Sequence, residues 1–168
     1  MKHTPASEFA LLLIKPDAYF WPHPRSNILE MVGERFNTKL VLEDFTMSRH
    51  AVDKLYIDHV GKPYYAAHKE FMLSGNVGVY LLERKTPSNV AAPEELRLLI
   101  GNTDPKKAAP GTIRQLFGKN LPQNAVHASD STAAVLRESR FFFSGIHLLN
   151  VGAGALVGST SAQFGGAT

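Results

Sequence analysis

His127 is the residue of this sequence best suited to covalent chemistry. It lies in the segment NAVHASD (residues 124–130), between a short predicted strand and the start of a predicted helix. Free N–H groups and the helix dipole make such an N-terminus attractive to phosphate groups. An imidazole in this place could bind a metal, act as a general base or accept a phosphoryl group.

The spacing of the other histidines argues against the metal. The seven histidines show no HxxxH or HxH pattern, and the chain has no cysteine to complete a site. Lys15, Arg97 and Arg114 offer cations for phosphate, and a neutral imidazole among cations suits attack on a phosphoryl group. Taken singly, a histidine beside a helix cap is more often structural. The order of these residues along the chain is what favours a phosphoryl-transfer site.

Composition restricts the possible classes of protein. The chain has 168 residues, and its 18 basic and 15 acidic residues give a net charge of +3. The absence of cysteine excludes a disulfide framework and a cysteine nucleophile. No charged residue occurs from Ser144 onwards. We therefore expect one folded domain over residues 1–143 and an uncharged Gly/Ala-rich tail over residues 144–168.

The apolar patterns predict the elements that must position His127. Strands are expected at residues 9–14, 39–48, 77–82 and 125–128. Helices are expected from Ser26 or Asn27 to Phe36, at residues 51–60, 64–73 and 94–100, and from Asp130 or Ser131 to about residue 141, with loops at 20–26, 84–93 and 101–123. This order predicts an α/β (α+β) sandwich. The simplest topology is a ferredoxin-like βαββαβ arrangement, with a small antiparallel sheet covered by helices.

Five motifs together resemble the nucleoside diphosphate kinase family. They occur in the family's order between about residues 9 and 143: IKPDAY (14–19), YYAAHKEFMLSG (64–75), GNTDP (101–105), PGTIR (110–114) and NAVHASD (124–130). The resemblance implies transfer of the γ-phosphate of a nucleoside triphosphate, typically ATP, to a nucleoside diphosphate. The transfer would be a ping-pong reaction through a phosphohistidine that maintains NTP and dNTP pools.

The resemblance also assigns roles to individual residues. His127 matches the nucleophile, and Ser129 and Glu138 match the pair that orients it. Asp130 matches a residue near Mg²⁺, a cofactor held mainly by the phosphates. The remaining matches contact the nucleotide: Lys15, Tyr56, Arg97, Thr103 and Arg114 at the phosphates, Lys15 and Asn124 at the ribose, and Tyr64 and Leu121 at the base.

The sequence departs from the family pattern in several places. Two short insertions are expected, at about residues 20–25 and 86–93. Ala128 stands where glycine is usual, and His68 stands where an apolar residue is usual. The tail replaces a segment that contributes to subunit packing in the family. None of these departures removes a catalytic residue, so we expect a divergent but active member that forms a homo-oligomer, hexameric or smaller.

Two other hypotheses belong to different functional classes. One is a catalytically silent kinase-like module that binds nucleotides or proteins. The other is a nucleic-acid-binding protein, which the small net charge and the absence of a basic stripe disfavour. No targeting signal or membrane-spanning segment is recognised. The expected location is therefore cytoplasmic, with nucleoside di- and triphosphates as partners, no membrane and no specific nucleic acid.

Overall fold

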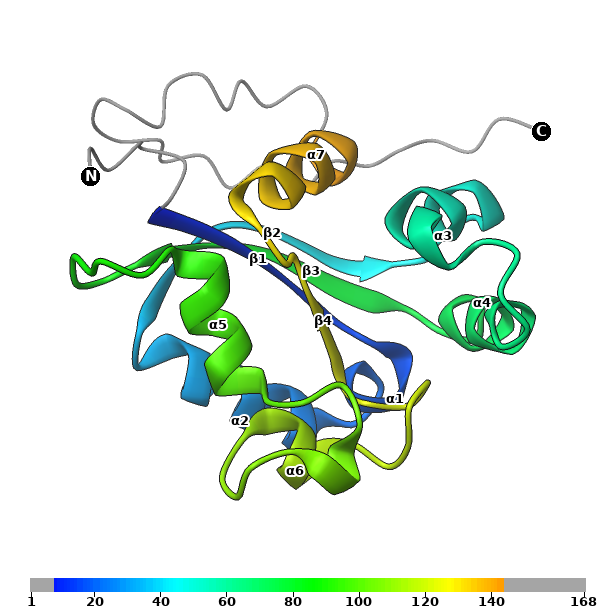
Figure 1. The fold of residues 1–168 in the computed structure, drawn as a ribbon, viewed down its shortest axis with the longest axis horizontal. Coiled ribbons are helices and arrows are strands. Elements are labelled where there is room, and N and C mark those ends of the chain that lie inside the picture. The colour runs from blue at the N-terminus through cyan, green and yellow to red at the C-terminus, as the bar shows by residue number, and fades with distance from the viewer. Residues whose placement is uncertain (1–7, 144–168) are drawn as a thin grey trace.

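A computed structural model describes residues 8–143, and the sheet in this region is four-stranded and antiparallel, in the order β2-β3-β1-β4 (Figure 1). The strands are β1 (Phe9–Ile14), β2 (Phe36–Phe45), β3 (Val77–Arg84) and β4 (Val126–Ala128). β1 is buried along its whole length, as its continuous apolar sequence predicts. The predicted ferredoxin-like α/β architecture is confirmed.

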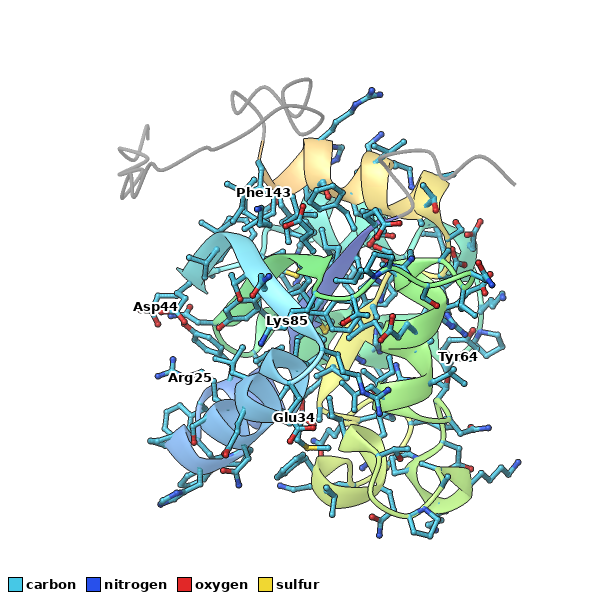
Figure 2. All side chains as sticks on the ribbon, turned by 90° about the vertical axis from the view of Figure 1, so that its left-hand side faces the viewer. Arg25, Glu34, Asp44, Tyr64, Lys85 and Phe143 are labelled. Carbon is cyan, nitrogen blue, oxygen red and sulfur yellow. The ribbon has the colours of Figure 1, made fainter. Side chains whose placement is uncertain are left out.

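Helices cover both faces of the sheet, and alternate residues of β1 separate the two cores (Figures 1 and 2). Leu12 and Ile14 face the first core, and Leu11 and Leu13 face the second. The first core includes side chains of α1 (Pro16–Tyr19), α2 (Pro22–Gly33), α5 (Ala92–Ile100) and α6 (Ile113–Phe117). The second includes side chains of α3 (Arg49–Leu55), α4 (Tyr65–Leu73) and α7 (Thr132–Phe142).

His127, the catalytic candidate, lies on the face of the sheet that packs against the second core. His127 pairs directly with Leu13 across the β1–β4 ladder, and directly opposed residues point to the same face of a sheet. α7 covers this face. Its N-cap is Ser131, one of the two residues expected there, whose hydroxyl accepts a hydrogen bond from the Ala134 amide. Strand pairing and this helix together bring Glu138 of α7 to His127 of β4.

Some predicted boundaries were wrong. The expected loop at residues 20–26 is mostly helical, because α2 begins at Pro22. Proline is tolerated in the first helical turn, where no intrahelical partner awaits its missing N–H. Phe36 was expected on the face of that helix, but it begins β2. The expected loop at residues 101–123 contains a 3₁₀ turn, η3 (Pro105–Lys107), and the helix α6.

No helix within residues 8–143 is long and apolar enough to cross a membrane. The predicted tail at residues 144–168 lies outside the described residues. The proposed domain boundary near residue 143 therefore stays a prediction.

Candidate active site

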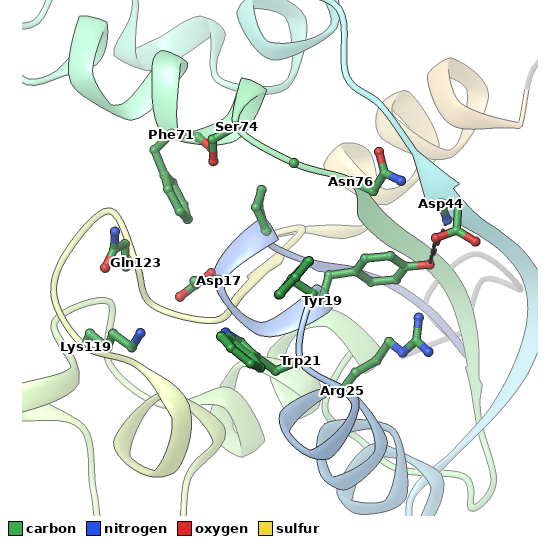
Figure 3. A pocket seen from close by; sticks show the side chains of 13 residues that line it. Asp17, Tyr19, Trp21, Arg25, Asp44, Phe71, Ser74, Asn76, Lys119 and Gln123 are labelled. Carbon is green, nitrogen blue, oxygen red and sulfur yellow. Dashed lines mark hydrogen bonds between the residues drawn. The ribbon is translucent and has the colours of Figure 1, made fainter.

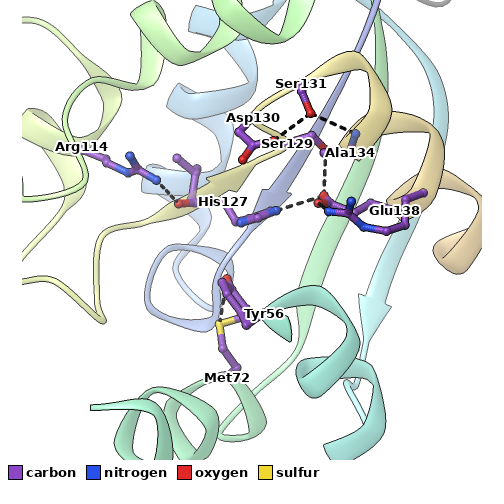
Figure 4. A network of polar contacts seen from close by, with 11 residues as sticks. Tyr56, Met72, Arg114, His127, Ser129, Asp130, Ser131, Ala134 and Glu138 are labelled. Atoms are coloured by element: carbon purple, nitrogen blue, oxygen red, sulfur yellow. Dashed lines mark hydrogen bonds and ion pairs between the residues drawn. The ribbon is translucent and has the colours of Figure 1, made fainter. Parts of the chain in front are cut away.

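His127 is held by a buried carboxylate (Figure 4). Its Nε2 lies 3.1 Å from Oε2 of Glu138, and the hydroxyl of Ser129 donates to the same oxygen at 2.7 Å. Glu138 and Ser129 are both almost fully buried. An ionised carboxylate only accepts hydrogen bonds, so Nε2 carries the proton and Nδ1 keeps its lone pair. The contact with Glu138 therefore leaves Nδ1 with a free lone pair on a partly exposed ring.

Tyr56 packs against the other side of this arrangement. Its ring centroid lies 5.3 Å from that of His127, in an edge-to-face contact. Its hydroxyl has one weak contact, a donation to Sδ of Met72 at 3.9 Å. Burial raises the pKa of Tyr56 far above its ordinary value, and the charge of Glu138 adds to this effect. The phenol therefore stays protonated and can donate a hydrogen bond to an anionic ligand.

Lys15 follows β1 and points toward the segment before β4. Its Nζ donates to Oδ1 of Asn124 at 2.8 Å and to the carbonyl of Pro122 at 3.3 Å. Nδ2 of Asn124 in turn donates to the backbone carbonyl of Thr103 at 2.8 Å. An ammonium group has three protons, so one remains for a ligand.

Burial and neighbouring cations lower the pKa values of Lys15 and Arg114. For Lys15, burial first and the charge of Arg114 second lower the pKa to about 7, against the opposing charge of Asp17. For Arg114, burial first and the charge of Arg97 second lower the pKa to about 10. Arg114 donates to the carbonyls of Gly101 and Val126, both at 3.1 Å. Its buried Nε has no hydrogen-bond partner within residues 8–143. Like charges gathered in this way favour the binding of a polyanion.

Two unusual backbone positions shape this pocket. Ala125 has a φ of 68°, rare for a residue with a side chain. Its amide donates to Oδ2 of Asp17 at 3.1 Å, and its carbonyl accepts from the Lys15 amide at 2.9 Å. Gly101 has a φ of 84°, and a Cβ atom there would lie 2.4 Å from Oγ1 of Thr112. Only glycine lets the end of α5 approach the start of α6, the helix that carries Arg114.

Other predicted residues lie at the periphery. Tyr64 and Leu121 expose more than half of their surface, and Figure 2 shows Tyr64 on the outside of the molecule. Arg97 is exposed on α5. Asp130 is also exposed, and it accepts a hydrogen bond from the Ser131 hydroxyl at 2.9 Å. Residues 8–143 contain no cluster of three or more side chains that could hold a metal ion.

The structure adds residues to which the sequence gave no role. Asp17 anchors the Ala125 turn, although it was noted only as part of the IKPDAY motif. Nδ1 of His59 lies 3.0 Å from the Tyr64 hydroxyl, and His68 packs against the Tyr56 ring. No spacing pattern marks these two histidines, because their partners come from other elements.

A separate cavity of about 490 Å³ lies beside α1 (Figure 3). Its walls include Tyr19, Trp21, Phe71 and Lys119. It contains neither His127 nor any predicted phosphate-binding residue, so it is not the candidate active site. The candidate catalytic residues lie instead where β4, α7 and the segment before β4 meet.

Comparisons with known proteins agree on one family. The family model described as nucleoside diphosphate kinase matches residues 8–148. A nucleoside diphosphate kinase from Parafrankia sp. is 38% identical over 144 residues, covering 84% of this chain and 98% of that protein. One from Fervidobacterium nodosum is 35% identical, covering 82% and 89%. The crystal structure of the Aquifex aeolicus nucleoside diphosphate kinase superposes with a TM-score of 0.72 at 32% identity, covering 83% of this chain and 96% of that one.

The ammonium of Lys15 should titrate near pH 7, because burial and Arg114 disfavour its charged form. NMR of the protein with ¹³Cε-labelled lysine would measure this pKa directly, with the exposed Lys62 as an internal reference. Arg114→Gln should raise the pKa of Lys15 by removing the nearby positive charge. Titration of Lys15 together with the surface lysines would contradict the account.

Proposed function

The chain belongs to the nucleoside diphosphate kinase family and is an enzyme of that kind, and we propose that Nδ1 of His127 carries the phosphoryl group between its two nucleotides. The enzyme transfers the γ-phosphate of a nucleoside triphosphate to a nucleoside diphosphate. The observation that carries the proposal is the Glu138–His127 contact, which leaves Nδ1 unprotonated beside a group of cations.

Transfer takes place in two displacements at phosphorus. The Nδ1 lone pair attacks the γ-phosphorus, the Nδ1–P bond forms, and the bond to the bridging oxygen breaks. The nucleoside diphosphate leaves with that electron pair. The imidazole gains positive charge, which the Glu138 carboxylate stabilises through Nε2–H. A phosphate oxygen of the second diphosphate then attacks the phosphohistidine and releases Nδ1.

Charged side chains of the pocket bind the phosphates. Lys15 has one free proton, Arg114 has an unpaired Nε–H, and Arg97 adds an exposed guanidinium. Phosphoryl transfer depends mainly on positioning and on neutralising spread negative charge, which these groups provide. The Tyr56 and Thr103 hydroxyls supply neutral donors to the same phosphates.

The sugar and base lie toward the exposed end of the site. Asn124 and Lys15 are linked by a 2.8 Å hydrogen bond and present polar groups to the ribose hydroxyls. Tyr64 stacks on the base, and Leu121 packs against its other face. Stacking on a tyrosine accepts any base, because every base has a π-face. This supports broad nucleotide use.

Enzymes of this family generally use Mg²⁺, and the chain's own groups fit a cation brought in by the nucleotide. The nearest candidate, Asp130, is a single exposed carboxylate, which suits contact through water rather than a protein cage. Bound Mg²⁺ would neutralise charge on the phosphates.

The alternative of a catalytically silent module has no support from the comparisons. The cytoplasmic location and the lack of a nucleic-acid partner stay predictions.

Incubation with γ-³²P-ATP and Mg²⁺, without acceptor, should label the protein in an acid-labile, base-stable form. His127→Ala should abolish the label and lower turnover by at least about 10³-fold, since the nucleophile is lost. His23→Ala, a change at an exposed position of α2, is the matched control and should label normally. Persistent labelling of His127→Ala would exclude His127 as the carrier.

We also propose that the chain forms a homo-oligomer through the edge of the sheet. Family members are generally oligomeric. β2 is a ten-residue edge strand whose outer backbone groups have no strand partner within residues 8–143. Val41 on this strand is 54% exposed. A long edge strand with exposed apolar side chains is a ready template for pairing with another copy.

Sedimentation velocity tests this assembly. The wild-type chain should sediment well above its monomer mass of 18.4 kDa. Val41→Lys should shift it to smaller species, because a lysine on an edge strand opposes pairing. A wild-type monomer at micromolar concentration would contradict the oligomer. An unchanged Val41→Lys assembly would place the interface elsewhere.

A further inference from the structure

His68 is a polar side chain in an unfavourable place. It lies on α4, and its Nε2 is buried without a hydrogen-bond partner among the residues that the structure describes. A buried polar atom without a partner costs stability, whereas an apolar side chain of similar volume would avoid that cost. Stability therefore does not explain the imidazole.

The neighbour of His68 is the tyrosine of the active site. Its ring centroid lies 4.4 Å from that of Tyr56, at an interplanar angle of 81°. This is the shortest of the three imidazole contacts of Tyr56, since His127 lies at 5.3 Å and His59 at 5.8 Å. Edge-to-face geometry is the favoured arrangement of two aromatic rings. His68 and His127 thus both contact the same tyrosine ring.

Ring contacts, more than hydrogen bonds, hold Tyr56 in place. Within residues 8–143 its hydroxyl reaches the Met72 sulfur alone, at the long distance of 3.9 Å. The contact with His68 therefore contributes to the orientation of the phenol plane. That plane in turn limits how far the His127 ring can turn about its hydrogen bond to Glu138.

His68 is uncharged in this setting. Burial first, and then the charges of Lys15, His59 and His127, lower its pKa to about 4. A neutral imidazole adds no further cation to the phosphate site, yet it keeps the polarised aromatic edge that an aliphatic side chain lacks.

We propose that His68 is a positioning residue that holds Tyr56 against His127 and so keeps Nδ1 aligned with the incoming phosphorus. This inference rests on the proposed role of His127. Without this support, Nδ1 of His127 would move more freely. The rate of the phosphoryl-transfer step would then fall, whereas the affinity for the nucleotide would change little.

The test separates stability from catalysis. His68→Leu should unfold at a temperature equal to or above that of the wild type, because the unpaired nitrogen is removed. The same variant should phosphorylate from ATP at least about fivefold more slowly in a single turnover, with little change in KM. His68→Phe, which keeps an aromatic edge, should recover most of the rate. His50→Leu, a change at an exposed position of α3, is the control and should leave both properties unchanged.

A double-mutant cycle tests whether His68 acts through Tyr56. In a Tyr56→Leu background, His68→Leu should have little further effect on the single-turnover rate. Long-range ¹H–¹⁵N spectra should show a changed His127 tautomer population in His68→Leu. Wild-type single-turnover rates in His68→Leu, or an undiminished effect in the Tyr56→Leu background, would overturn the inference. A wild-type enzyme that fails to label at all would instead refute the proposed role of His127.

Discussion

The hydrogen bond from Nε2 of His127 to Glu138 is the interaction on which the proposed chemistry depends. His127 lies on the edge strand β4, and Glu138 lies on α7. The two residues meet because β4 pairs with β1 and α7 covers the second core. Ser129 donates to the same carboxylate oxygen, so the acceptor is fixed from two sides. The fold thereby selects one tautomer of one histidine. In the role that we propose for His127, this selection defines which nitrogen attacks the phosphorus.

The second constraint is the burial of cations beside that nitrogen. Lys15 and Arg114 are both nearly inaccessible to solvent. Burial lowers the pKa of each, the charge of Arg114 adds to this effect at Lys15, and the charge of Arg97 adds to it at Arg114. Hydrogen bonds to Asn124, Gly101 and Val126 hold their positions. In the function we propose, a triphosphate bound here would relieve the repulsion among these cations and would meet donors that are already in position. The electrostatic repulsion among the cations would thus contribute to the affinity for nucleotides.

The sequence was sufficient for the architecture, and it named residues that the structure brings together around His127, whose roles stay predictions. Strand β1 is a continuous apolar run, and the NAVHASD segment places His127 before a capped helix. The start of α2 was missed, because Pro22 and Pro24 favoured the prediction of a loop. Proline is nevertheless accepted in the first turn of a helix, where both residues lie.

The contacts of Asp17, His59 and His68 were beyond sequence reasoning, since each partner lies on another segment of the chain. Asp17 shows the difference. Its motif was recognised, but its hydrogen bond to the Ala125 amide depends on a positive φ that no local pattern announces in an alanine. Local sequence patterns identify candidate residues, whereas the packing of α4 against the end of α3 decides which aromatic rings are in contact.

The most direct test of the central claim is the site of phosphate attachment on the His127 ring. ³¹P NMR of the denatured phosphoenzyme, read against synthetic phosphohistidine isomers, distinguishes the two nitrogens. Because Glu138 occupies Nε2, we predict phosphate on Nδ1 alone. Phosphate on Nε2 would mean that the Glu138 contact does not select the nucleophilic nitrogen, which would contradict the proposed mechanism.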